Sequence, residues 1–195
     1  MSNVNDLAPL SRRIKDVTHP VHESLDRAIM TRHLFHSAEG YRTFAVMNYL
    51  FHRDLNGLYQ NSELMALVPD LGVRSRFHHL RQDLEDLRVP LPYSTVDPVP
   101  AEVSSAMGWL YVAEGSKLGA NFLSKLTEKL GFTSQFGARH LAADPAGRGQ
   151  SWNTFRDALD TADLDAGRVI AGAQAGFTRV RHYLNTLTQH THAPC

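Results

Sequence analysis

The chain has 195 residues, 43% of them hydrophobic and 21% charged, a composition typical of one globular domain spanning residues 1–195. Twenty Lys and Arg balance twenty Asp and Glu, so the basic charge of a nucleic-acid binder is missing, and no run approaches the roughly 20 apolar residues that cross a membrane. The single cysteine, Cys195, excludes an internal disulfide and a multi-cysteine zinc site, and favours a cytoplasmic location.

The composition favours helix over strand. The chain holds 24 Leu and 20 Ala but only 3 Ile and 13 Val, and β-branched residues are the better strand formers. Apolar side chains recur every three or four residues, which predicts amphipathic helices in an all-α protein. These stripes cover 44–58, 73–87 and 170–187. Ser37, Ser151 and Asp165 are the expected N-caps, and frayed ends are expected at about 1–6 and 189–195.

Eleven histidines direct attention to metal or haem binding. The Glu-x-x-His pairs of di-iron bundles and the His-Glu-x-x-His motif of zinc proteases are absent. His22 shares a helix face with Leu25 and Ile29, where a core histidine is the commoner outcome and an axial haem ligand the alternative. If Pro20 leaves the helix collinear, Lys15 lies on the same face about 10 Å away, a distance comparable to that between a haem iron and its propionates.

Segment 107–123 is predicted to be helical although it contains three glycines, each of which weakens a helix by about 1 kcal/mol relative to alanine. Gly108, Tyr111, Gly115, Gly119 and Phe122 fall on one face. Close packing of helices explains such a face, and so does a flat ligand lying against bare backbone. The residues alone leave both explanations open.

Several segments together resemble the bacterial haem oxygenases of the iron-acquisition type. They are GWLYVAEGSKLGANFL (108–123), FGARHLAADPAGRGQSWNTF (136–155), MNYLFHRDLNGLY (47–59), RSRFHHLRQDLEDL (74–87) and the HxxL motif of His22 and Leu25. The resemblance covers about 10–187, and the segments containing EGSKLG and FGARHLA are its most specific parts. It implies a single helical domain in which haem b is sandwiched between a proximal and a distal helix.

The resemblance also implies roles for individual residues. His22 falls on the axial ligand of the haem iron, and Gly115 and Gly119 on the distal backbone. Lys15 and Tyr111 fall on propionate contacts typical of opening at the α-meso carbon. The resemblance also implies that four further side chains hold ordered water on the distal side of the haem. These are Asn48, His52, Arg76 and Trp152, and Asn48 departs from the Gln that is usual at its position.

The implied reaction converts haem, as both substrate and cofactor, to biliverdin, CO and ferrous iron. It uses O2 and electrons from a reductase or ferredoxin. Lys117, Lys125 and Lys129 could form a basic patch for such a partner, although solvated helix charge is the commoner explanation. A glycine-lined helix offers no acid–base group of the kind that peroxidases use. The enzyme is expected to be a cytoplasmic monomer, with no nucleic-acid or membrane partner, serving iron acquisition or bilin supply. The alternatives are a non-catalytic haem transporter of the same fold and a helical protein that binds no haem.

Overall fold

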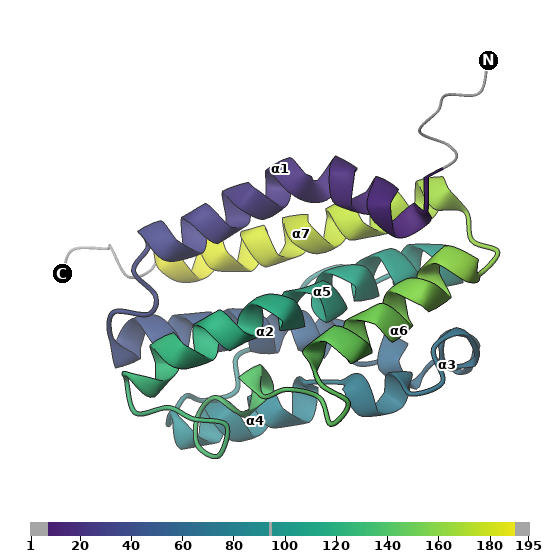
Figure 1. Ribbon diagram of the computed structural model, residues 1–195. Helices are drawn as coiled ribbons and strands as arrows, with labels where there is room; N and C mark the ends of the chain where they lie inside the picture. The colour runs from purple at the N-terminus through teal and green to yellow at the C-terminus, as the bar shows by residue number, and fades with distance from the viewer. Residues whose placement is uncertain (1–7, 94, 190–195) are drawn as a thin grey trace.

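The structure, a computed structural model, describes residues 8–93 and 95–189 (Figure 1). Within them the chain forms seven α-helices and no extended strand, which confirms the all-α prediction. The expected frayed ends lie outside the described residues, except Gln189, which ends the last helix. The helices are α1 (Leu10–Thr31), α2 (Ala38–Leu55), α3 (Ser62–Leu67), α4 (Phe77–Asp86), α5 (Val103–Glu128), α6 (Arg148–Thr161) and α7 (Ala166–Gln189), with short 3-10 turns η2 (Leu58–Gln60), η3 (Leu71–Arg74) and η4 (Arg139–Leu141).

The most extensive contact between helices joins α5 to α7. A Cβ atom on Gly108 would lie 2.0 Å from the carbonyl oxygen of Val169, and one on Gly172 would lie 2.2 Å from that of Ser105. No side chain fits at either position, because backbone atoms cannot move aside cheaply. Close packing therefore explains Gly108.

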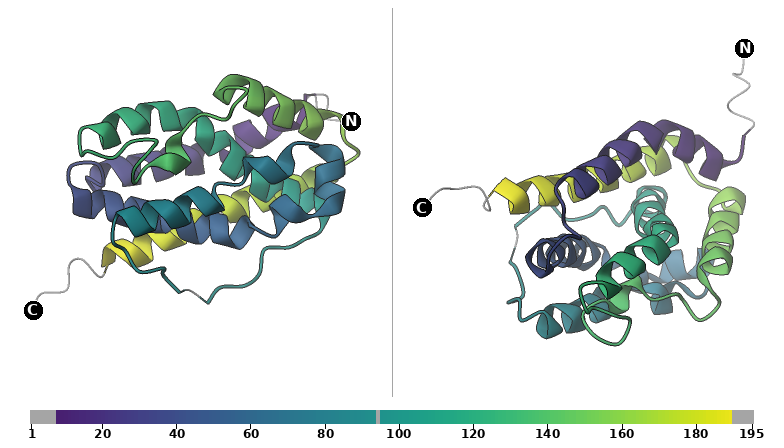
Figure 2. Two further views of the ribbon diagram at one scale, coloured as in Figure 1. Left: turned by 90° about the horizontal axis from the view of Figure 1, so that it is seen from below. Right: turned by 60° about the vertical axis from the view of Figure 1, so that its left-hand side comes forward.

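The helices form three tiers in Figure 1, with α1 and α7 at the top, α2, α5 and α6 in the middle, and α3 and α4 at the bottom. The right-hand view of Figure 2 also shows α1 and α7 together at the top, and the two helices are in contact. The start of α1 is tied to α6, since the backbone N–H and the hydroxyl of Ser11 each donate to Asp160 at 2.7 Å. α1 continues through Pro20, so Lys15 and His22 belong to one helix, as expected.

Two of the three expected N-caps are confirmed. The hydroxyl of Ser37 accepts from the backbone N–H three residues on, and the carboxylate of Asp165 does the same at the start of α7. Ser151 was the wrong choice, because Gly147, with φ of +83°, ends the preceding turn and α6 begins directly after it. Ser151 instead lies buried in the first turns of α6.

The stripe predicted to begin at Val73 starts one turn too early. Val73 lies in η3 and is exposed, and α4 begins only at Phe77. The proline-rich residues 90–93 and 95–100 belong to the connection between α4 and α5 and form neither helix nor strand. Arg179 of α7 fastens this connection by donating to the carbonyl oxygen of Asp97 at 2.9 Å.

Gly108→Ala should lower the free energy of unfolding by about 3 kcal/mol, because the new methyl group forces α5 and α7 apart. Gly119→Ala should leave it unchanged or raise it by up to about 1 kcal/mol, since a Cβ there meets nothing within 4 Å and alanine favours helix. Urea denaturation measures both values. Equal midpoints for the two variants would contradict this assignment.

Candidate functional site

α1 presents the imidazole of His22 at the surface, so the interpretation of His22 as a core residue is wrong. Its side chain is 56% exposed, and its ring lies 5.4 Å from the ring of Phe177 on α7. The Nε2 atom is 3.4 Å from a carboxylate oxygen of Asp26, one turn further along α1. An uncovered imidazole beside a carboxylate is available as a metal ligand.

Gly115 and Gly119 leave the backbone of α5 bare. A Cβ atom on Gly119 would meet nothing within 4 Å, and one on Gly115 would lie in ordinary contact with the ring of Trp152, at 3.6 Å. Neither glycine is required by contact with another helix, in contrast to Gly108. The packing explanation therefore fails for these two positions, and the explanation by a ligand is the one left.

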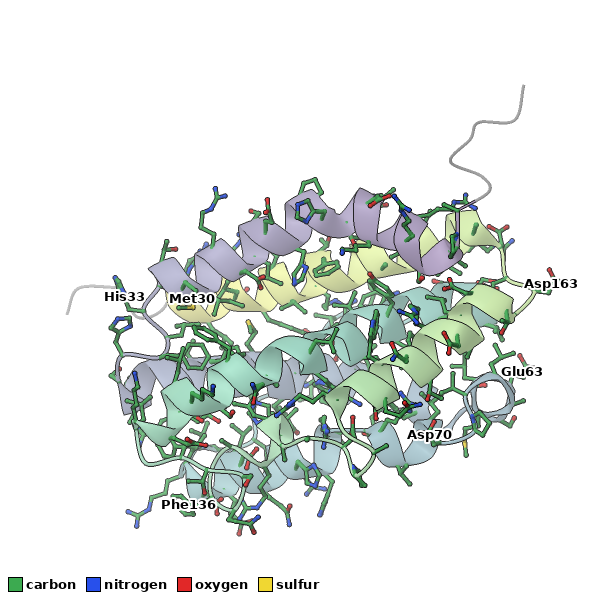
Figure 3. All side chains as sticks on the ribbon, in the orientation of Figure 1. Met30, His33, Glu63, Asp70, Phe136 and Asp163 are labelled. Carbon is green, nitrogen blue, oxygen red and sulfur yellow. The ribbon has the colours of Figure 1, made fainter. Side chains whose placement is uncertain are left out.

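Large apolar side chains are exposed on both α1 and α5. They are Val17 and Met30 on α1 and Leu118 and Phe122 on α5. Figure 3 shows Met30 near the end of α1 that leads to α2. Apolar side chains left uncovered on two long helices suit an apolar ligand that both helices contact.

Tyr111 and Lys15 are brought toward the same end of α1. Tyr111 is buried with its ring 5.3 Å from that of Trp152. Burial raises the pKa of Tyr111, and the nearby carboxylates of Asp16 and Asp160 raise it further. Because Asp16 follows Lys15 directly on α1, the phenol lies close to the turn that carries this exposed lysine.

His52 and Arg76 lie together in a buried polar cluster behind α5. Burial lowers the pKa of His52 to about 3, and the positive charge of Lys117, His140 and Arg76 adds to the shift. Arg76 donates to Asp144 at 2.6 Å. Among the described residues, the Nδ1 atom of His52 and the Nε atom of Arg76 are buried without a hydrogen-bond partner.

Asn48 and Trp152 occupy different surroundings. Asn48 is one turn before His52 on α2, half-buried, and its amide donates to the carbonyl oxygen of Phe44 at 2.9 Å. Trp152 lies on α6, half-buried against Tyr111 and Gly115. The structure thus places Asn48 and His52 on one helix face, and Trp152 beside the bare glycine segment.

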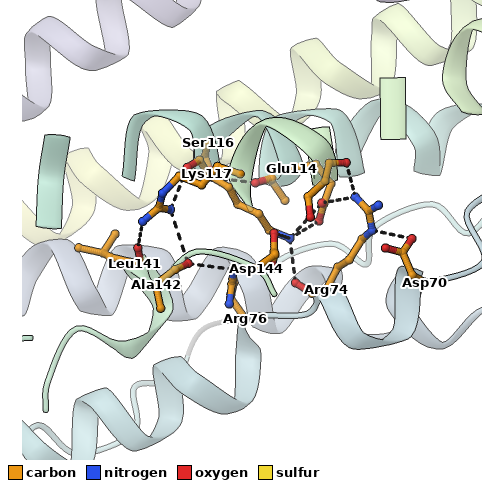
Figure 4. A network of polar contacts seen from close by, with 12 residues as sticks. Asp70, Arg74, Arg76, Glu114, Ser116, Lys117, Leu141, Ala142 and Asp144 are labelled. Atoms are coloured by element: carbon orange, nitrogen blue, oxygen red, sulfur yellow. Dashed lines mark hydrogen bonds and ion pairs between the residues drawn. The ribbon is translucent and has the colours of Figure 1, made fainter. Parts of the chain in front are cut away.

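Sequence reasoning missed the charged residues that fill the cluster in Figure 4. The carboxylate of Glu114 accepts from the hydroxyl of Tyr59 at 2.8 Å, from Arg74 at 3.1 Å and from Lys117 at 2.9 Å. Lys117 is buried, so it belongs to no surface patch, whereas Lys125 and Lys129 remain exposed. The available signal was a carboxylate and an ammonium three residues apart in the mostly apolar stretch 106–120 of α5.

The comparisons with known proteins agree with one another. The family model described as heme oxygenase matches residues 8–186. Heme oxygenase PigA of Pseudomonas aeruginosa is 40% identical over 157 residues, 80% of this chain and 79% of that protein. The heme oxygenase of Xanthomonas campestris pv. campestris is 33% identical over 147 residues, 69% of this chain and 84% of that protein. The chain belongs to the haem oxygenase family.

The fold of this haem oxygenase matches a solved relative. The NO- and CO-bound haem oxygenase of Neisseria meningitidis superimposes with a TM-score of 0.85 and 36% identity, covering 92% of each chain. The protein is accordingly a haem-degrading oxygenase, and haem is its substrate. Within the described residues, no helix has the length and apolarity needed to span a membrane.

The residues exposed on α1 and α5 suit haem, because they include an uncovered imidazole, a bare backbone segment and apolar side chains. A separate groove of about 710 Å³ lies under the connection between α4 and α5. It is lined by the end of α2 and the proline-rich segment, including Tyr49, Leu58 and Tyr93. None of the predicted haem contacts lines this groove.

The low pKa of His52 predicts how stability depends on pH. The unfolded chain takes up this proton near pH 6.5 and the folded protein only near pH 3, so stability is lost as pH falls between these values. The loss from this group should be about 1.4 kcal/mol per pH unit. Denaturant unfolding should show that the free energy of unfolding falls less between pH 7 and pH 5 for His52→Gln than for the parent. His36→Gln, at an exposed position, is the control, and parallel losses in all three proteins would contradict the prediction.

Proposed function

We propose that this enzyme opens the ring of haem b with O2 and electrons from a reductase or ferredoxin, releasing biliverdin, CO and ferrous iron. One observation carries the proposal. α1 exposes the imidazole of His22, whereas α5 exposes bare backbone at Gly115 and Gly119, and both helices pack on α7. No observation favours storage of haem without turnover. We assign the enzyme to the cytoplasm, as a monomer that recovers iron.

In this proposal His22 would hold the haem by binding its iron. A neutral imidazole ligand needs its second ring nitrogen hydrogen-bonded, because that bond fixes the tautomer and the ring orientation. The carboxylate of Asp26, one helical turn away, lies 3.4 Å from Nε2, so it can accept from that nitrogen only when the iron is bound through Nδ1. The adjacent Glu23 does not serve, because neighbouring side chains diverge on a helix, and its carboxylate pairs instead with His19 at 3.5 Å.

Lys15 and Tyr111 fix how the ring is seated. The ammonium group of Lys15 is exposed, and Tyr111, with its raised pKa, keeps its proton and can donate a hydrogen bond. Both groups suit the carboxylates of the haem propionates. The α-meso carbon is the bridge farthest from the propionates, so holding the propionates at this end directs the α-meso edge toward the interior of the site.

The absence of side chains at Gly115 and Gly119 determines which oxidation reaction α5 can assist. No side chain projects from Gly115 or Gly119, so no acid–base group stands over the haem to promote heterolytic O–O cleavage. When bound, haem supplies the iron at which O2 is reduced. Oxidation of the ring edge is then favoured over formation of a peroxidase-type oxidant.

Protons come through water held by the polar side chains. The buried atoms without partners on His52 and Arg76 call for ordered water, because buried polar groups are rarely left unsatisfied. His52 is neutral at pH 7, so its imidazole can accept a hydrogen bond at one nitrogen and donate at the other. Asn48 and Trp152 complete this set, Asn48 next to His52 on α2 and Trp152 at the edge of the glycine segment.

Anaerobic titration with hemin, followed by ascorbate and air with catalase present, tests the reaction. The Soret band should disappear while biliverdin absorption grows, and chromatography should show mainly the α isomer because Lys15 and Tyr111 hold the propionates. A stoichiometric complex that never bleaches, even with a competent reductase, would mean binding without catalysis. A mainly β or δ product would refute the assignment of these two residues.

Replacing His22 by alanine should remove the axial ligand, change the haem spectrum and lower turnover by about 100-fold or more. Added imidazole should restore the spectrum by occupying the vacated space. His19→Ala is the matched control, an exposed histidine one turn earlier on α1, and should behave as the parent. Normal spectrum and turnover in His22→Ala would place the ligand elsewhere.

A further inference from the structure

Lys117 lies at the centre of the glycine segment but faces away from the haem. It is two residues from both Gly115 and Gly119, which places it about 200° around the helix from each. Its ammonium group donates to the carbonyl oxygen of Arg74 and to the carboxylate of Glu114, both at 2.9 Å, as Figure 4 shows. The side chain therefore fastens α5 to η3.

The main chain of the same residue is held from a second direction. Arg148, the first residue of α6, donates to the carbonyl oxygen of Lys117 at 3.1 Å. Its guanidinium also donates to the carbonyl oxygens of Leu141 and Ala142 in the loop that precedes α6. The middle of the bare segment is thus fixed by one contact through a side chain and one through the backbone.

A segment with two glycines needs such contacts. Each glycine weakens the helix by about 1 kcal/mol relative to alanine, and neither contributes packing that would hold the backbone in place. We propose that Lys117 and Arg148 are positioning residues that hold the Gly115–Gly119 backbone at a fixed height over the haem and so set the gap in which O2 reacts. This inference rests on the proposed function, in which that backbone faces the haem.

The ion pairs around Lys117 indicate that this side chain can be replaced without unfolding the protein. If Lys117 is removed, Glu114 keeps its bonds to Tyr59 and Arg74, and Asp144 keeps its ion pair with Arg76. No buried carboxylate is left unpaired, which is the usual cause of severe destabilisation. Lys117→Met fills a similar volume, so this variant should fold and bind hemin.

The first measurement is hydrogen exchange of the α5 amides in the haem-free protein. Lys117→Met and Arg148→Gln should both exchange faster over 115–121 than the parent, because the segment has lost an outside contact. Lys125→Met, an exposed lysine on the same helix, should match the parent. Unchanged exchange in both variants would overturn the proposal whether or not haem binds.

The second measurement uses the ferrous haem complex with CO. Both variants should keep the hemin affinity of the parent, whereas their CO dissociation rate should change by about tenfold and their product isomers should spread, because small displacements near a reacting group have large effects. Faster exchange with unchanged CO dissociation and isomers would make the contacts structural only and overturn the positioning role. If Lys117→Met does not fold, Arg148→Gln decides the matter by the same criteria. Failure of the parent to bind hemin would instead refute the proposed function.

Discussion

Direct contact between the backbones of α5 and α7 fixes the geometry on which the haem site depends. At Gly108 and Gly172 no side chain can come between the two helices, so their separation cannot relax. α1 packs on α7 as well, and His22 meets Phe177 there. The distance between the imidazole and the bare segment of α5 is therefore set through α7, by contacts that do not involve the ligand.

Glycines on a single face of α5 serve opposite purposes. Gly108 lacks a side chain so that another backbone can touch it, whereas Gly119 lacks one where nothing touches it at all. Both glycines have the spacing of residues on one helix face. That spacing shows which face a residue occupies but does not show what lies against the face. Sequence reasoning could therefore name both explanations but could not assign them to positions.

The helices themselves were predictable, because apolar periodicity and the caps at Ser37 and Asp165 are local signals. The exposure of His22 was not, since its neighbours on the helix face suggest a core position and only the placement of α1 leaves it uncovered. The burial of the charged side chains could not be predicted from the sequence either. Lys117 would ordinarily be solvated, and its acceptor on Arg74 lies 43 residues away in the sequence, so no local pattern announces the contact.

α5 separates two environments by the thickness of a single helix, about 10 Å. One face carries the bare backbone of Gly115 and Gly119, and the other carries the ion pairs of Glu114 and Lys117. Neighbouring residues project about 100° apart, so Gly115 lies at the border between these environments, next to Glu114 in the chain and against Trp152 in space. In the proposed reaction, a proton moving from the polar face to the haem would pass this point, where α5 has no side chain and Trp152 bounds the route.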